Sequence, residues 1–220
     1  YEIEQSLRFD DGSTSYLKRT PSTASNRRTW TFSAWIKRGS LPSNVQTIFM
    51  ASNPSSAGGM LRFNSDKLVL LGFSGGVSYS LSTNRLFRDP SAWYHIVLSV
   101  DTTQGTAANR LKMYVNGVQE TSFSSATYPS TNPHYLGVTD ESTLQLYFDG
   151  YMGEVNFIDG QALTPDSFGE TGDYGEWKAK SYAGGYGTNG FYLDFKSSGS
   201  VGNDAAGSNN WTPTNLAATD

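Results

Sequence analysis

The carboxylates that could take part in catalysis stand in one short run, Glu-Val-Asn-Phe-Ile-Asp, which begins at Glu154 and ends at Asp159. Retaining hydrolysis of a glycosidic bond needs two carboxyl groups about 5 Å apart, one as nucleophile and one as acid/base. Asp159 precedes a glycine and suits a turn better than a cleft. A second pair, Asp140 and Glu141, falls in a loop with no fixed orientation. We therefore expect no catalytic residue, and we interpret Glu154 as a solvent-facing strand residue.

The two histidines and the absence of cysteine exclude the common transition-metal sites. His95 alternates with apolar residues in a strand-like run, and His134 follows a proline in a loop. Neither the His-x-His nor the His-Glu-x-x-His spacing of zinc sites occurs. The chain has no cysteine, which excludes thiolate ligands, a cysteine nucleophile and disulfides. Because many animal extracellular modules carry disulfides, their absence favours a bacterial or viral source.

Calcium is the one ion that the sequence suggests, although no cofactor is required. Asn203, Asp204 and Asn209 share a loop, and Asp194 lies on the adjoining strand. Carboxylate, amide and backbone oxygens are the ligands that hard cations take. Asp, Asn and Gly runs also form ordinary turns, so a purely structural loop remains the alternative.

Charge and hydropathy exclude two classes of partner. The 220 residues carry a formal net charge of −4, and the densest cationic pair is Arg27 with Arg28. Phosphate neutralisation needs clustered Lys and Arg, so we expect no nucleic-acid partner. No apolar run reaches the length of a membrane span, so we expect no membrane insertion.

The elements that must position these residues are short strands separated by turns. Apolar and polar residues alternate with a period of two in most segments, and Asn116-Gly117 is a strong hairpin signal. One helical turn is expected over residues 163–168, an ordered loop over 170–190, and an irregular tail after residue 195. The expected strands cover residues 6–10, 15–20, 29–37, 46–51, 59–63, 67–73, 77–81, 93–100, 111–115, 135–138, 145–148, 151–158 and 190–195. This pattern predicts an all-β sandwich or barrel.

Three segments together resemble the laminin-G-like branch of the concanavalin A-like lectin superfamily. They are Trp93 to Asp101, Leu111 to Val118 and Phe148 to Pro165, and their order and spacing both agree with that family. The resemblance covers about residues 5–168. It implies an antiparallel β-sandwich of the concanavalin A-like jelly-roll type with almost no helix.

The same resemblance bears on catalysis and on ligands. Laminarinase-type glycoside hydrolases of this superfamily carry Glu-x-Asp-x-x-Glu on one strand, and here Asn156 replaces the middle acid. The resemblance therefore implies that this protein is a non-catalytic member of the superfamily. Family members often hold calcium near loops like that at Asp204, and they bind glycans at loop edges or on a sheet face. The aromatic and polar residues in or beside polar loops are then the candidate glycan contacts: Tyr128, His134, Tyr135, Asp140 and Trp177.

The C-terminal part departs from the order of the family. The strand Leu193-Asp194-Phe195 and the Asp/Gly/Asn loop after it resemble elements that normally precede the first hairpin, yet here they follow the last strand. We expect residues 1–168 to form the laminin-G-like sandwich. Residues 169–220 would close the same sandwich, with the strand at 190–195 beside the N-terminal strand, where it covers an exposed edge. The alternative is that this piece begins another repeat.

A further resemblance is to domains in structural proteins of marine bacteriophages. It is carried by two motifs, Gly-Gln-Ala-Leu-Thr-Pro and then Tyr-Gly-Thr-Asn-Gly-Phe-Tyr-Leu-Asp-Phe. This resemblance implies a non-catalytic fibre, appendage or decoration module at the virion surface or outside the cell. The expected partners are other virion proteins, further copies of the chain (a trimer is favoured) and host-surface glycan. The alternatives are a secreted carbohydrate-binding module of a bacterial polysaccharide-degrading protein and a laminarinase-type hydrolase.

Overall fold

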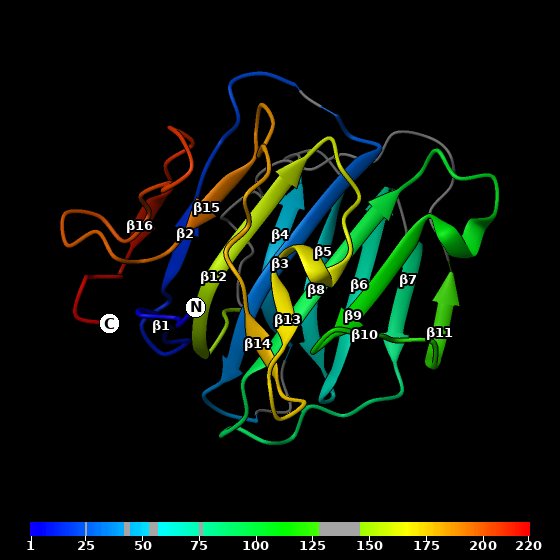
Figure 1. Cartoon of the computed structure of the whole chain (residues 1–220), viewed down its shortest axis with the longest axis horizontal. Coiled ribbons are helices and arrows are strands. Elements are labelled where there is room, and N and C mark those ends of the chain that lie inside the picture. The colour runs from blue at the N-terminus through cyan, green and yellow to red at the C-terminus, as the bar shows by residue number, and fades with distance from the viewer. Residues whose placement is uncertain (25, 42–44, 53–56, 75–76, 128–145) are drawn as a thin grey trace.

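The computed structural model describes the whole chain except residues 25, 42–44, 53–56, 75–76 and 128–145. The described residues form two antiparallel sheets packed face to face, with two small ribbons at their margins (Figure 1). The helical elements among them are the single 3₁₀ turns η1 (Ala107–Asn109) and η3 (Pro165–Ser167). The predicted all-β antiparallel sandwich is confirmed. No described helix is long and apolar enough to cross a membrane.

The larger sheet has seven strands among the described residues, and β12 lies near one of its edges. The order is β1-β12-β3-β8-β9-β10, and β15 also pairs with β12. Both β1 and β15 line the same edge of β12 end to end, because Leu7 pairs with Met152 and Leu193 pairs with Val155. The strands are β1 (Leu7–Phe9), β3 (Thr29–Arg38), β8 (Tyr94–Asp101), β9 (Leu111–Val115), β10 (Val118–Gln119), β12 (Gly150–Asp159) and β15 (Phe191–Leu193).

The second sheet has five described strands in the order β11-β7-β6-β5-β4. They are β4 (Gln46–Ser52), β5 (Ala57–Asn64), β6 (Lys67–Ser74), β7 (Val77–Thr83) and β11 (Phe123–Thr127). Two ribbons complete the fold. One pairs β13 (Gly169–Thr171) with β14 (Trp177–Ala179), and the other pairs β2 (Tyr16–Lys18) with β16 (Thr212–Thr214).

The main core lies between the two sheets and follows from the alternation along each strand. In β3, Trp30, Phe32 and Ile36 point to one face and are almost fully buried there. Burying large side chains of this kind contributes about 1.5–3 kcal/mol each relative to leaving them exposed. The alternate residues of β3, such as Ser33 and Trp35, are buried as well, so the outer face of this strand is also covered.

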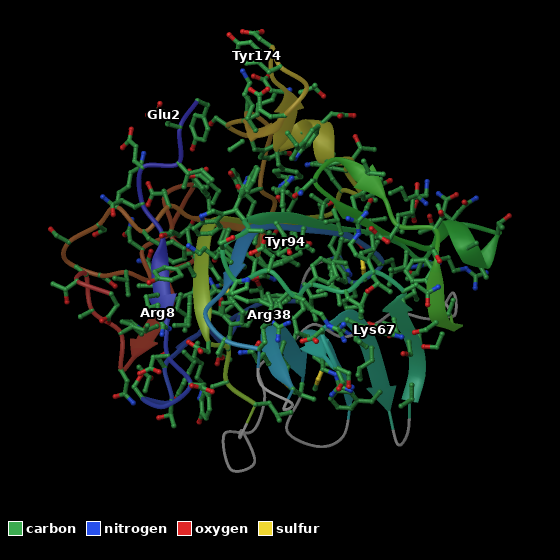
Figure 2. All side chains as sticks on the ribbon, turned by 90° about the horizontal axis from the view of Figure 1, so that it is seen from below. Glu2, Arg8, Arg38, Lys67, Tyr94 and Tyr174 are labelled. Carbon is green, nitrogen blue, oxygen red and sulfur yellow. The ribbon has the colours of Figure 1, made fainter. Side chains whose placement is uncertain are left out.

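A buried cation ties the two sheets together at the end of β3. Arg38, labelled in Figure 2, lies inside the fold. It is 1% exposed and donates hydrogen bonds to Oε1 of Gln46, Oδ1 of Asp66 and the carbonyl of Phe87. Its guanidinium also lies 4.7 Å from the ring centroid of Phe63. Because a buried charge is tolerated only when it is paired and hydrogen-bonded, these contacts fix how the sheets sit on each other.

Most expected strands are present, and the differences lie after residue 120. The expected loop over 170–190 contains the β13–β14 ribbon, whose tip carries the 97% exposed Tyr174 (Figure 2). The tail expected to be irregular contains β16, and β11 was not expected. These strands are short and polar, and tertiary pairing stabilises them more than their own pattern does.

Three further expected strands are those over residues 190–195, 145–148 and 135–138. The late strand is β15, but it pairs with β12 rather than with the N-terminal strand β1, because both occupy the same edge of β12. The strand expected over 145–148 is wrong for its described part: residues 146–148 are irregular. The strand expected over 135–138 lies outside the described residues.

Candidate functional site

Glu154 is a buried acceptor of hydrogen bonds, and its interpretation as a solvent-facing strand residue is wrong. Its side chain is only 6% exposed, and its φ of 51° belongs to a bulge in β12 opposite β3. The hydroxyls of Tyr1 and Tyr192 both donate to Oε2, each over 2.6 Å. A bulge re-aims a side chain, and here it turns the carboxylate beneath the N-terminal segment.

Burial and the neighbouring carboxylate keep the two tyrosines protonated. Burial first, and then the hydrogen bond to Glu154, raises the pKa of Tyr1 to about 12. The same two causes raise the pKa of Tyr192. Both hydroxyls therefore act as donors near neutral pH, and the group serves to hold the chain terminus on β12 and β15.

The two positions that complete the acid motif are engaged elsewhere. Asn156 accepts a hydrogen bond from the hydroxyl of Tyr186 over 2.7 Å. Asp159 accepts one from the backbone N–H of Asn189 over 2.9 Å through Oδ2. Each side chain thus fixes a different part of the segment that follows η3. The pair Asp140 and Glu141 lies outside the described residues.

His95 is a buried structural histidine. It is 1% exposed and stacks between the rings of Trp35 and Trp177, at centroid distances of 5.0 and 6.0 Å. Its Nδ1 accepts a hydrogen bond from Nε1 of Trp177 over 2.9 Å, and its Nε2 lies 2.9 Å from Oγ of Ser33. Burial lowers the pKa of His95 to about 3, so the ring is neutral at physiological pH.

Trp177, an expected glycan contact in or beside a polar loop, is the first residue of strand β14. A Cβ on Gly117 would stand 2.6 Å from its Cε3, and one on Gly169 would stand 2.5 Å from its Cζ2. The indole therefore lies directly over two glycine backbones while its N–H is bonded to His95. These contacts give Trp177 a packing role, because its ring and its donor are both occupied within the fold.

The outer face of the larger sheet is covered over part of the neighbouring strands β12, β3, β8 and β9. A second small core forms there from Val97, Tyr114, Ile158 and Phe168. Leu163, Tyr182 and Tyr186 pack against it from the segment after β12. A polysaccharide cannot lie on this part of the sheet, because side chains of the protein itself cover it.

Three of the four residues expected to bind calcium take part in hydrogen bonds within the fold. Asp204 is 4% exposed, and its two oxygens accept the backbone N–H groups of Tyr192, Ala206 and Asn209 over 2.9–3.0 Å. Asp194 accepts from the backbone N–H of Lys196 instead. The side chain of Asn209 donates to the carbonyls of Thr188 and Gly190, and Asn203 is exposed. The Asp204 loop is thus closed by its own hydrogen bonds.

The carboxylates that do converge were not singled out from the sequence. Among the described residues, Asp10, Asp11 and Asp149 form the one group of three or more potential metal ligands whose ligand atoms lie within 4.8 Å of one another. Asp149 is also paired with Arg8 over 2.7 Å, and Asp10 accepts the backbone N–H of Gly12. Existing partners therefore offset part of the negative charge of this group.

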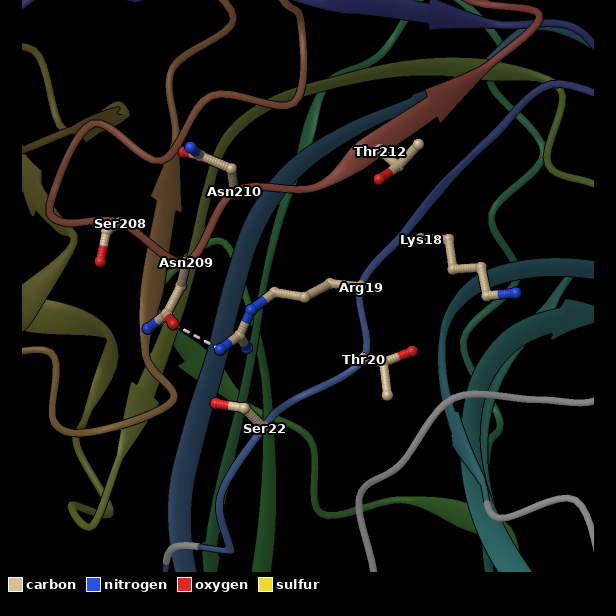
Figure 3. Close-up of a pocket in the computed structure, with 8 residues that line it drawn as sticks. All are labelled: Lys18, Arg19, Thr20, Ser22, Ser208, Asn209, Asn210 and Thr212. Carbon is tan, nitrogen blue, oxygen red and sulfur yellow. Dashed lines mark hydrogen bonds between the residues drawn. The ribbon is translucent and has the colours of Figure 1, made fainter.

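An open polar pocket lies between the β2–β16 ribbon and the loop before β16 (Figure 3). It has a volume of about 480 Å³. The described residues of its lining carry cationic, hydroxyl and amide side chains, and neither a carboxylate nor an aromatic ring is among them: Lys18, Arg19, Thr20, Ser22, Ser208, Asn209, Asn210 and Thr212.

Arg19 points across this pocket toward Asn209 and hydrogen-bonds to its Oδ1 (Figure 3). The guanidinium also donates to the carbonyl and to Oδ1 of Asn189, over 3.3 and 3.2 Å. Burial lowers the pKa of Arg19, although an arginine remains charged at any physiological pH. Two neighbouring segments of the same chain, at Asn189 and Asn209, thus hold the guanidinium of Arg19 in place.

Sequence reasoning missed the pocket because its two halves lie at opposite ends of the chain. Only Asn209 was singled out, and then as a calcium ligand. The cationic pair Lys18 and Arg19 at the end of a strand was a local signal, but the pairing of β2 with β16 was not predictable from either segment. The other expected glycan contacts, Tyr128, His134, Tyr135 and Asp140, lie outside the described residues.

These features define an antiparallel β-sandwich module whose described residues form a polar surface pocket between β2 and β16. Residues 11–167, well over half of the chain, match the laminin G family described as the concanavalin A-like lectin/glucanases superfamily. The chain therefore belongs to that superfamily. No curated protein matches the sequence.

Two solved structures give the scale of the structural likeness. Domains LG4-5 of the mouse laminin α1 chain are 16% identical with a TM-score of 0.49, over 84% of this chain and 47% of that one. The sialidase of Trypanosoma rangeli in complex with sialic acid is 16% identical with a TM-score of 0.43, over 64% of this chain and 22% of that one. This chain thus spans less than half of the length of either protein.

Proposed function

We propose that this protein is a non-catalytic adhesion module that binds glycan and serves in a bacteriophage fibre, appendage or decoration protein. The observation that carries the proposal is the pocket between β2 and β16, which offers hydroxyl, amide and cationic donors within about 480 Å³. Pockets of roughly 300–1,000 Å³ accommodate small ligands, and a sugar residue falls within that range. The phage setting is supported by the sequence resemblance at residues 160–195.

The absence of catalysis is supported by how the acids are used. Glu154 binds two tyrosine hydroxyls, and Asp159 binds a backbone amide. A retaining glycosidase instead needs two carboxyl groups about 5 Å apart that face one cleft. The sheet face beside these residues is filled by Phe168 and its neighbours.

Weak binding at one pocket explains why an oligomer is part of the proposal. A shallow polar site gains little from buried apolar area, so a single contact with sugar is weak. Several copies on one fibre raise the apparent affinity through effective concentration, without any new contact. We therefore propose assembly with other virion proteins and self-association as a trimer, at the virion surface or outside the cell.

Light scattering combined with a glycan array tests this function on the full chain. The expected result is a stable trimer that binds a subset of glycans on the array, measured with and without calcium. A monomer with millimolar glycan affinity would favour the alternative, a carbohydrate-binding module of a polysaccharide-degrading protein. A trimer that binds no glycan under either condition would leave an architectural role and contradict the adhesion proposal.

A further inference from the structure

Four side chains from neighbouring strands form a row on the outer face of the larger sheet, which we call the cation–aromatic row. They are Arg8 on β1, Tyr151 on β12, Lys37 on β3 and Trp93 one residue before β8. Tyr151 is the register partner of both Arg8 and Lys37, and the continued register of β3 with β8 places Trp93 opposite Lys37. Alternation directs all four outward. Their neighbours along the strands belong to the main core: Leu7, Phe9, Ile36 and Met152.

The members of the row contact one another through cations and rings. The guanidinium carbon of Arg8 lies 5.5 Å from the ring centroid of Tyr151, and Nζ of Lys37 lies 5.7 Å from it. The ring centroids of Trp93 and Tyr151 are 6.4 Å apart, at an interplanar angle of 58°. Cation–π contacts of this kind attract a charged group to a ring and hold it there. The row is therefore preorganised before any ligand arrives.

The row lies on a part of the sheet that the covering segments leave accessible. All four of its side chains are partly exposed. The small core at Val97, Tyr114 and Ile158 covers another part of the same face, and Trp177 covers His95. Because adjacent strands are about 4.8 Å apart, a row that crosses four strands is about 14 Å long.

Lys37 is the cation of the row whose charge the described residues do not offset by an ion pair. Arg8, in contrast, pairs with Asp149 over 2.7 Å. Asp89 is close enough to interact electrostatically with Lys37, but its carboxylate accepts the backbone N–H and the hydroxyl of Ser91. The ammonium of Lys37 thus keeps its donors for a ligand.

We propose that the cation–aromatic row binds acidic polysaccharide, with a carboxylate or sulfate at Lys37 and the apolar face of a sugar ring on Trp93. The N–H groups of Lys37 and Trp93 can only donate, and the hydroxyl of Tyr151 can donate as well, so the row suits a ligand rich in acceptors. Charge-assisted hydrogen bonds are about twice as strong as neutral ones, so the anionic group is what the row distinguishes.

The shape of the row favours an extended sugar chain over a protein partner. A specific protein interface buries roughly 800 Å² on each side, whereas the row is one residue deep and about 14 Å long. An extended polyanion can lie along such a line across the strands. The proposal adds a second site to the proposed glycan binding and does not use the pocket between β2 and β16.

Affinity electrophoresis of the full chain in gels that contain paired polysaccharides tests the proposal. Polygalacturonate against its methyl ester isolates the effect of the carboxylate, and carrageenan against agarose isolates the effect of the sulfate. We expect roughly tenfold tighter binding to the charged member of at least one pair, and weaker binding as NaCl rises from about 50 to 300 mM.

Two substitutions at Lys37 and a matched control locate the site. Lys37→Gln should weaken the binding roughly fivefold, because it removes the cation, and Lys37→Glu should abolish the binding, because it repels the anion. Lys112→Gln should leave the binding unchanged. Lys112 lies between two core residues of β9 and so points outward from the same face of the sheet. Thermal unfolding of each variant confirms that it is folded.

Tryptophan fluorescence gives a second measurement at the same row. The native chain is titrated with oligogalacturonate or a carrageenan oligosaccharide, whichever matches the preferred polysaccharide. Its emission should change, because a sugar ring on Trp93 alters the surroundings of the indole. Trp93→Phe should lose this change although it keeps a ring for stacking. An emission change of the same size in Trp93→Phe would contradict the proposed contact.

Three electrophoresis results would overturn the proposal, and each leaves the proposed function to its own test. Equal binding to the charged and neutral members of both pairs would show that no anion is selected. Charge selection that survives Lys37→Glu would place the anion site elsewhere on the protein. No binding to any of the four polysaccharides would remove the row as a glycan site, whereas the glycan array decides the proposed function independently.

Discussion

Nε1 of Trp177 donates a hydrogen bond to Nδ1 of His95 over 2.9 Å, and this contact determines which ring nitrogen carries the proton. An indole N–H can only donate, so Nδ1 must be the acceptor. In the neutral ring, Nε2 is then protonated and donates to Oγ of Ser33. One bond thus links the β13–β14 ribbon to the centre of the larger sheet.

A substitution that removes the hydrogen bond between Trp177 and His95 but keeps an aromatic ring at position 177 should destabilise the fold. Trp177→Phe keeps an aromatic ring over Gly117 and Gly169 but leaves the buried Nδ1 of His95 without a partner. We expect the free energy of unfolding to fall by about 1–3 kcal/mol in urea titrations. Trp93→Phe, at a partly buried tryptophan, should cost less than about 1 kcal/mol. Equal losses in the two variants would contradict the role of the bond.

The lowered pKa of His95 predicts a specific loss of stability in acid. The ring has a pKa of about 3 when folded and about 6.5 when unfolded, so only the unfolded chain takes up the proton as the pH falls below 6.5. Between pH 6.5 and 5.0 the free energy of unfolding should drop by about 2 kcal/mol, at 1.36 kcal/mol per pH unit. His95→Gln should flatten this dependence.

Nitrogen NMR of the histidine rings checks the same point directly. His134→Gln leaves His95 as the remaining histidine of the two in the sequence. Its ring should keep Nδ1 unprotonated from pH 7.5 to pH 5. A ring that titrates near pH 6.5 in the folded protein would contradict the neutral tautomer.

The hydrogen bonds of Asp204 predict a weak response to calcium at that loop. Its oxygens already accept three backbone N–H groups. The melting temperature in about 2 mM calcium should therefore agree within about 1 °C with the melting temperature in a chelator, which lowers free calcium roughly a thousandfold. Asp204→Ala should lower the stability by about 1–3 kcal/mol, because three partly buried backbone donors lose their acceptor. A larger calcium effect that is lost in Asp204→Asn would restore a metal role for this loop, whereas one lost in Asp11→Asn would place the ion at Asp10, Asp11 and Asp149.

The engagement of Glu154 predicts that the protein does not cleave polysaccharides. Incubation with laminarin, agarose and alginate should release no reducing ends above the blank, and Glu154→Gln should give the same result. The substitution should instead lower the stability by about 1–3 kcal/mol, because two tyrosine hydroxyls lose a charged acceptor. Release of reducing ends by the native chain that Glu154→Gln abolishes would show that the acid is catalytic.

The sandwich was predictable because period-two alternation and turn residues are local signals. The strands at Trp30–Ile36 and Tyr94–Val100 carry them clearly, and so does the Asn116-Gly117 turn. Burial of Glu154 was not predictable, because it depends on a bulge and on Tyr1, which is far away in the sequence. The same holds for the pocket, where tertiary pairing of β2 with β16 joins residues 18–22 to residues 208–212.

The central claim, that glycan binds in the pocket between β2 and β16, is tested most directly by mapping amide chemical shifts. The labelled full chain is titrated with the glycan that binds most strongly on the array. The account predicts that the largest shift changes fall in residues 18–22 and 208–212. Shift changes centred on residues 128–140 or on the β13–β14 ribbon, with residues 18–22 unaffected, would contradict it.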